Sequence, residues 1–106
     1  MSRNYPKYSI VAPVFNEEET LPEFYRRIYA VVQELDSEAE LLLIDDGSTD
    51  NSLDLMQELQ SQVSFVRIIS FSRNFGHQVA ITAGIDYAKG DAVIVIDSDL
   101  QDPPEV

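Results

Sequence analysis

Residues 93–102 read VIVIDSDLQD, a hydrophobic run that stops abruptly at a cluster of carboxylates and one amide. The apolar residues favour a strand. Because side chains alternate along a strand, Asp97, Asp99 and Gln101 point to one side if the extended path continues. Oxygen donors of this kind suit a hard cation such as Mg²⁺ or Mn²⁺. We therefore expect a divalent metal at these three residues, holding an anionic ligand such as a diphosphate.

The rest of the chain alternates strand and helix patterns. Strands are expected over residues 8–14, 40–44, 65–71 and 91–96, and apolar residues at helical spacing lie between them. This order predicts an α/β fold, namely one three-layer, Rossmann-like domain over residues 1–106 with a mostly parallel sheet. Thr20 and Glu23 are expected to form a capping box, and Gly90 to cap the third helix. Because residues 103–105 resemble a helix start, we expect a domain truncated after its fourth strand.

Composition narrows the class of protein. The chain has 106 residues, 19 acidic and 7 basic, with a formal net charge of −12 and no cysteine. This charge argues against nucleic acid or an anionic membrane surface as a direct partner, although an acidic surplus also simply keeps proteins soluble. No apolar run approaches a membrane span and no signal peptide is recognisable. We expect the segment to be soluble and cytoplasmic.

Polar or acidic junctions follow all four expected strands, at residues 13–18, 45–50, 73–78 and 97–102. Each alone has a local explanation as a turn or a helix cap. Arg73 could favour an anion at a helix N-terminus or simply answer the acidic clusters, and His77 alone is more often structural than catalytic. Parallel strands bring their carboxyl ends to one edge, so the four junctions together predict one ligand-binding cleft.

The runs PVFNEE (13–18), IDDGSTD (44–50), RNFGHQ (73–78) and DSDLQDPPEV (97–106) together resemble the family 2 glycosyltransferases. The resemblance is greater to the polyprenyl-phosphate branch, which comprises dolichyl-phosphate mannose synthases and bacterial undecaprenyl-phosphate sugar transferases. The last two runs are the more specific and favour the bacterial type. The resemblance implies the nucleotide-sugar-binding, N-terminal part of a catalytic domain of the glycosyltransferase A type.

The resemblance also implies roles for individual residues. Pro13, Phe15 and Glu17 would lie along the nucleoside, with Ile44 and Asp46 near the base. Asp97, Ser98 and Asp99 would form the metal and diphosphate motif, in which Asp97 and Asp99 are the catalytic residues and Gln101 is a further metal ligand. Family members usually have alanine at the position of Ser98.

The implied reaction transfers a sugar from a nucleotide-sugar donor to a polyprenyl phosphate. The resemblance favours uridine over guanosine as the nucleoside of the donor. It would be inverting, depend on Mg²⁺ or Mn²⁺, and occur at the cytoplasmic face of the membrane. The acceptor would be bound by parts absent from this chain, so we expect the 106 residues to be inactive alone. Apolar surface left uncovered would favour self-association of the fragment.

Two other classes use a similar layout. A response-regulator receiver domain also binds Mg²⁺ at strand ends, but its acidic pair follows the first strand, whereas Asp45 and Asp46 follow the second. A sugar-nucleotidyltransferase would have a glycine-rich, basic loop after the first strand, and PVFNEE is neither.

Overall fold

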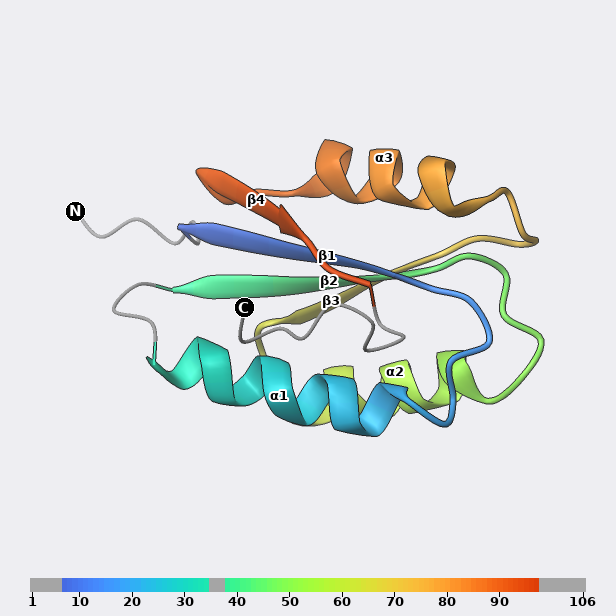
Figure 1. The fold of residues 1–106 in the computed structure, drawn as a ribbon, viewed down its shortest axis with the longest axis horizontal. Coiled ribbons are helices and arrows are strands. Elements are labelled where there is room, and N and C mark those ends of the chain that lie inside the picture. Colours follow the sequence, from blue (N-terminus) through green and yellow to red (C-terminus); the bar gives the residue numbers. More distant parts are fainter. Residues whose placement is uncertain (1–6, 35–37, 98–106) are drawn as a thin grey trace.

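The computed structural model describes residues 7–34 and 38–97, which form one sheet with three helices packed on it (Figure 1). The four strands are all parallel, in the order β3-β2-β1-β4. Along the chain, the elements are β1 (Tyr8–Val14), α1 (Leu21–Glu34), β2 (Ala39–Asp45), α2 (Ser52–Gln62), β3 (Val66–Ser70), α3 (His77–Tyr87) and β4 (Ala92–Val95). The predicted element order and parallel sheet are confirmed.

The sheet lies between two helical layers. Helices α1 and α2 cover one face and α3 covers the other (Figure 1). Side chains of the central strands point alternately to the two faces of the sheet, as the pleat requires. Ile10, Ala12 and Val14 of β1 pack towards α1 and α2 with Phe24, whereas Val11 packs in a separate cluster on the α3 side.

Glycines allow α3 and its exit loop to lie close to β1. A Cβ on Gly84 would lie 2.3 Å from Cγ1 of Val11, and a Cβ on Gly90 would lie 2.6 Å from the backbone nitrogen of Ser9. Helix α3 ends at Tyr87 with Ala88 as its cap residue. The prediction that Gly90 caps this helix is therefore wrong, because Gly90 is needed for its close approach to the β1 backbone.

The predicted capping box at the start of α1 is also not the arrangement found. The Thr20 N–H donates to the Glu17 carbonyl, and the Thr20 hydroxyl donates to the Glu17 carboxylate at 2.8 Å. The Glu23 carboxylate instead binds Arg26 and Arg27, whose hydrogen bonds lower the pKa of Glu23 to about 2. Two basic residues one turn ahead on the same helix outcompete the cap.

A buried polar network lies at the other end of the sheet, near the start of β2. The Glu40 carboxylate, 5% exposed, accepts hydrogen bonds from the Ser9 hydroxyl (2.5 Å), the Lys89 N–H (2.7 Å) and the Arg67 guanidinium (2.6 Å). Arg67 also donates to the carbonyl of Tyr87 at 3.2 Å. Burial raises the pKa of Glu40, but these hydrogen bonds outweigh burial and hold the pKa below its ordinary value. The network ties the end of α3 to three strands.

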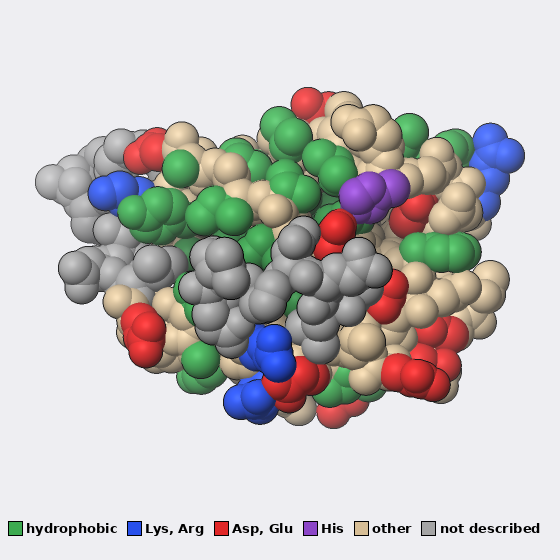
Figure 2. All heavy atoms as spheres, viewed as in Figure 1, with side chains coloured by type: hydrophobic (Ala, Val, Ile, Leu, Met, Phe, Trp, Pro, Cys, Tyr) green, Lys and Arg blue, Asp and Glu red, His purple; other side chains and the backbone are tan. Residues whose placement is uncertain are grey.

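Hydrophobic side chains remain exposed over α3 and β4. They include Val79, Ile85, Tyr87, Val93 and Val95, each at least 40% exposed, and Figure 2 shows hydrophobic side chains gathered there. The self-association expected from such a surface stays a prediction. Within residues 7–34 and 38–97, no helix has both the length and the apolar character to cross a bilayer.

We predict that Glu40→Gln lowers the free energy of unfolding by about 2 kcal/mol near neutral pH, because it removes the charge from a buried hydrogen-bonded pair. A carboxyl whose pKa is lower in the folded state stabilises the fold above its unfolded pKa of about 4.3. The difference between the variant and the wild type should therefore shrink as the pH falls below that value. Urea unfolding at several pH values measures it.

Glu38→Gln is the matched control, since Glu38 is exposed two residues earlier in the chain. Its effect should stay within about 0.5 kcal/mol. Equal stabilities of the two variants would contradict a stabilising role for the Glu40 network.

Candidate functional site

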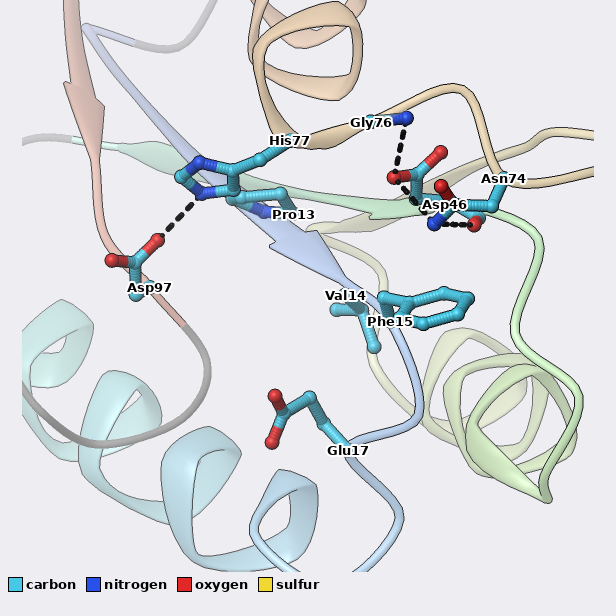
Figure 3. Close-up of a pocket in the computed structure, with 9 residues that line it drawn as sticks. All are labelled: Pro13, Val14, Phe15, Glu17, Asp46, Asn74, Gly76, His77 and Asp97. Carbon is cyan, nitrogen blue, oxygen red and sulfur yellow. Dashed lines mark hydrogen bonds and ion pairs between the residues drawn. The ribbon is translucent and has the colours of Figure 1, made fainter.

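A cleft of about 540 Å³ opens where the carboxyl ends of β1, β2 and β4 meet the start of α3 (Figure 3). This is the sheet edge at which open parallel sheets bind ligands. Its lining residues come from all four junctions singled out in the sequence: Pro13, Val14, Phe15, Glu17, Asp46, Asn74, Gly76, His77 and Asp97.

The loop after β1 is fastened to the loop after β2. Asn16 has a positive φ of 53°, and its side-chain oxygen accepts hydrogen bonds from the N–H groups of Thr49 (2.8 Å) and Asp50 (3.3 Å). The Glu17 N–H donates to the buried Ser52 hydroxyl at 2.8 Å. With its backbone held in this way, the loop presents Phe15 and Glu17 to the cleft.

Asp50, two residues before the start of α2, joins the helix to the same loop. Its carboxylate accepts hydrogen bonds from the N–H of Ser52 (2.9 Å), the first residue of α2, and from the N–H of Glu18 (3.2 Å). Burial raises the pKa of Asp50, but the bonds from Ser52 and Glu18 outweigh burial and lower the pKa overall. The N-cap residue of α2 is Asn51, which makes no side-chain cap hydrogen bond, so the expectation of a cap residue among residues 48–50 is wrong by one position, although the Asp50 carboxylate does bind the first N–H of the helix.

Each of the two adjacent carboxylates at the end of β2, Asp45 and Asp46, has its own hydrogen-bond donors. Asp45, 2% exposed, accepts from the Ser48 N–H (3.0 Å) and the Ser70 hydroxyl (3.2 Å). Asp46, 3% exposed, accepts its hydrogen bonds from a different segment, the loop between β3 and α3. These separate donor sets keep two neighbouring negative charges compatible with burial.

Asp46 fixes the loop that begins α3. Its Oδ1 accepts from the Phe75 N–H (2.8 Å). Its Oδ2 accepts from the Gly76 N–H (3.1 Å) and from Nδ2 of Asn74 (3.1 Å), two residues that Figure 3 shows beside it. Gly47 completes the contact, since a Cβ there would lie 2.2 Å from the backbone carbon of Arg73. Both oxygens of Asp46 are engaged by protein donors, so this carboxylate is an anchor and not an open metal ligand.

Arg73 lies on an aromatic surface at the outer edge of the same loop. Its guanidinium stacks on the Phe75 ring at 4.6 Å, and Phe75 meets Phe71 edge-on at 5.6 Å. Within the described residues, Arg73 forms no ion pair. The contact that the structure shows for Arg73 is this cation–π interaction. The interpretation that Arg73 offsets the charge of the acidic clusters, part of which lies outside the described residues, stays a prediction.

The start of α3 meets the end of β4 through one side-chain contact. Nε2 of His77 lies 2.9 Å from Oδ1 of Asp97 (Figure 3). The His77 and Asp97 side chains are 60% and 34% exposed, and Figure 2 shows the single histidine on the open surface beside acidic groups. Both groups are accessible to a ligand in the cleft.

Five of the predicted site residues line one cleft: Pro13, Phe15, Glu17, Asp46 and Asp97. Ile44 does not, because its side chain is fully buried in the cluster with Val11, Leu42 and Ala80. Ser98, Asp99 and Gln101 lie outside the described residues. Thus the structure brings together residues up to 84 positions apart in the sequence, from Pro13 to Asp97.

Four lining residues were not among the predicted site residues: Val14, Asn74, Gly76 and His77. Three of them belong to the run RNFGHQ, which was singled out in the sequence without a role for each residue. The missed signal is the Asn-x-Gly-His spacing at a strand-to-helix junction, which supplies two N–H donors for a carboxylate and places an imidazole at the first turn.

Of the predicted metal ligands, the described part of the chain contains Asp97. Within residues 7–34 and 38–97, there is no group of three or more His, Asp or Glu side chains that could hold a metal ion. Asp97 has the chemistry of a ligand, since its carboxylate lies open at the cleft and, among the described residues, has one hydrogen-bond partner.

The family description "Glycosyl transferase family 2" matches residues 9–106. The chain belongs to this family. That match spans the cleft and all four junctions, so family membership covers the whole site.

Curated relatives extend the similarity. The chain is 53% identical over 106 residues to the uncharacterized glycosyltransferase YkcC of Bacillus subtilis, and 49% identical over 107 residues to the undecaprenyl-phosphate 4-deoxy-4-formamido-L-arabinose transferase of Pseudomonas fluorescens. These alignments cover 100% and 97% of this chain but 32% and 31% of the relatives. The chain therefore spans about a third of the length of the curated relatives it matches.

Solved structures confirm the fold class. Residues 1–349 of S. aureus TarS in complex with UDP-GlcNAc match with a TM-score of 0.77 at 24% identity, covering 88% of this chain and 26% of that one. The mannosyltransferase PcManGT of Pyrobaculum calidifontis, in complex with GDP-Man and Mn²⁺, matches with a TM-score of 0.76 at 21% identity, covering 90% and 28%. The four parallel strands with flanking helices are those of the glycosyltransferase A fold.

We predict that Asp46→Asn lowers the free energy of unfolding by about 2 kcal/mol, because an amide NH₂ would face N–H donors that now meet a carboxylate oxygen. Amide exchange at Phe75 and Gly76 should accelerate, since their acceptor is weakened. Hydrogen-exchange NMR and urea unfolding measure the two effects.

Asp86→Asn makes the same chemical change at an exposed position of α3 and should alter stability by less than about 0.5 kcal/mol. Unchanged exchange at Phe75 and Gly76 in Asp46→Asn would contradict the anchoring role.

Proposed function

We propose that this chain supplies the donor-binding part of an inverting glycosyltransferase that moves a sugar from a uridine diphosphate sugar to a polyprenyl phosphate. One observation carries the proposal: in a family 2 chain, the cleft at the carboxyl edge of the sheet combines an aromatic face, a fixed loop and an accessible carboxylate. Asp97 is an accessible acid of that cleft with one hydrogen-bond partner among the described residues, whereas both oxygens of Asp46 are engaged by the chain itself.

The donor class is supported by the cleft and by structural neighbours. Phe15, 43% exposed, offers a ring surface, and the Glu17 carboxylate offers an acceptor for hydroxyl or N–H groups of a nucleoside. TarS of the same fold is described with UDP and with UDP-GlcNAc, and PcManGT with GDP-Man. The two TarS ligands favour uridine as the base proposed here.

The acceptor class is supported by a curated relative. The Pseudomonas fluorescens protein, 49% identical over the aligned region, is named as a transferase acting on undecaprenyl phosphate. A phosphate acceptor is already ionised near neutral pH, with a second pKa of about 6, so it requires positioning more than a strong general base. In the proposed step a phosphate oxygen bonds to the anomeric carbon as the bond to the nucleoside diphosphate breaks, and the nucleoside diphosphate leaves.

We propose Mg²⁺ or Mn²⁺ as the cofactor. Asp97 would hold it, together with Asp99 and Gln101, which lie outside the described residues. Support comes from the open carboxylate of Asp97 and from PcManGT, described with Mn²⁺. When bound, the cation would stabilise the negative charge that develops on the leaving diphosphate. The chain's own contribution is to place Asp97 at the cleft, while both oxygens of Asp46 accept hydrogen bonds from the loop before α3.

We predict that the chain binds UDP with Mg²⁺ or Mn²⁺ present and loses this binding in EDTA. Asp97→Asn should weaken the metal-dependent binding more than about tenfold, because it removes a negatively charged ligand. Isothermal titration calorimetry with UDP measures both effects.

Asp91→Asn is the matched control, since Asp91 is exposed just before the other end of β4 and carries the same charge. It should bind as the wild type does. Equal binding in EDTA, or equal losses in both variants, would contradict a metal role at Asp97.

A separate prediction concerns the acceptor. We expect the 106 residues to bind the donor without transferring sugar, because a net charge of −12 repels a phosphate at an anionic membrane. Incubation with UDP-glucose, Mg²⁺ and undecaprenyl phosphate, followed by chromatography of the lipid, checks this. Steady formation of glycosylated lipid would support the acceptor class but contradict the expected dependence on further residues.

A further inference from the structure

We infer that His77 is a positioning residue that orients the Asp97 carboxylate for the cation, acting as a hydrogen-bond donor and not as a metal ligand. The inference rests on the proposed function and assigns a role to the one histidine of the chain. Its support is the contact itself, the rigid placement of His77, and the lack of other constraints on Asp97 among the described residues.

The contact has the geometry of a direct hydrogen bond. Nε2 of His77 lies 2.9 Å from Oδ1 of Asp97, well within hydrogen-bond range. Because a carboxylate oxygen only accepts, Nε2 must carry the hydrogen. Oδ2 of Asp97 has no partner among the described residues, so it stays available to a cation at the cleft.

The backbone of His77 is held in place by the residues that precede it in the chain. It is the first residue of α3, and the two residues before it donate their N–H groups to the buried carboxylate of Asp46 at 2.8 and 3.1 Å. Gly76 reaches this position with a φ of 107°, which favours glycine. The imidazole therefore projects from a fixed backbone, and its exposure of 60% reflects its place at the rim of the cleft.

Asp97, in contrast, has little else among the described residues to fix it. Strand β4 is exposed along its whole length and pairs with β1 through residue Val95, and the last backbone bond before Asp97 runs from the Ile96 N–H to the Val11 carbonyl at 3.0 Å. The Asp97 side chain thus follows the end of the strand ladder. A donor from α3 across the cleft selects one orientation of its carboxylate.

Orientation of this kind affects metal affinity. Carboxylates that bind metals are themselves hydrogen-bonded by neighbouring groups, and losing such a partner typically lowers metal affinity about 10- to 100-fold. Direct ligation by His77 makes a different prediction. Mg²⁺ prefers oxygen ligands, whereas imidazole suits later transition metals, so a histidine ligand would favour Co²⁺ or Ni²⁺ over Mg²⁺.

The test compares three variants of the chain. His77→Leu removes the donor, His77→Gln retains an N–H donor, and Gln78→Leu changes the neighbouring exposed residue on the same helical turn without touching Asp97. Calorimetry measures the affinity of each for Mg²⁺ and Co²⁺ in the presence of UDP. Circular dichroism confirms that each variant is folded.

We expect His77→Leu to lose about tenfold or more in affinity for both metals, by a similar factor, while His77→Gln recovers most of the loss and Gln78→Leu matches the wild type. A loss confined to Co²⁺ would make His77 a ligand and overturn the positioning role. Wild-type affinity in His77→Leu would overturn it as well. A wild-type chain that binds no metal with UDP would instead contradict the proposed function.

A measurement without metal distinguishes failure of the positioning role of His77 from failure of the proposed function. Since the chain has one histidine, its imidazole gives a single pair of ¹⁵N resonances in a sample without an affinity tag. Asp97→Asn should shift the Nε2 resonance, whereas Asp91→Asn should not. If Asp97→Asn leaves the resonance unchanged, the contact is absent in solution and the inference fails, whatever the metal titration shows.

Discussion

The Asp46 carboxylate is buried directly after β2 and accepts hydrogen bonds from two backbone N–H groups and one side-chain amide of the loop before α3. A buried charge without partners would be strongly unfavourable, so carboxylate and loop stabilise each other only together. This contact fixes the loop from which α3 begins, and hence where the imidazole of His77 lies beside Asp97.

The same logic separates the two adjacent acids of the IDDGS run. Asp45 is engaged by Ser48 and Ser70 and secures the turn after β2 to β3. Asp46 instead accepts hydrogen bonds from the loop before α3. Neither offers an open carboxylate, although both look like ligands in the sequence. By contrast, Asp97 follows β4, which lies at an edge of the sheet that the described residues form, and among those residues its carboxylate has one hydrogen-bond partner, His77.

Much of this architecture can be read from the sequence because its signals are periodic. The strand ending at Val14 and the helical spacing of Phe24 and Ile28 follow from burial alone. What the sequence conceals is competition between partners. The Thr20 and Glu23 spacing predicts a cap, but Arg26 and Arg27 bind the glutamate. Likewise Ile44 lies two residues before Asp46 on the same face of β2, but it is covered there by α3, in the cluster with Ala80, whereas Asp46 lies past the end of the strand. The predicted roles of Ser98, Asp99 and Gln101 remain predictions.

Helix α3 is tethered at both ends by carboxylates of one segment. Asp46 binds the loop before it, and Glu40, six residues earlier, binds the N–H of Lys89 after it, with Arg67 bridging to the carbonyl of Tyr87. Between these anchors lie 11 helical residues. One residue more or less would move a helix end by about 1.5 Å and turn it by about 100°. The spacing of the two acids, one in β2 and one directly after it, therefore limits how many residues α3 can have between its two anchors.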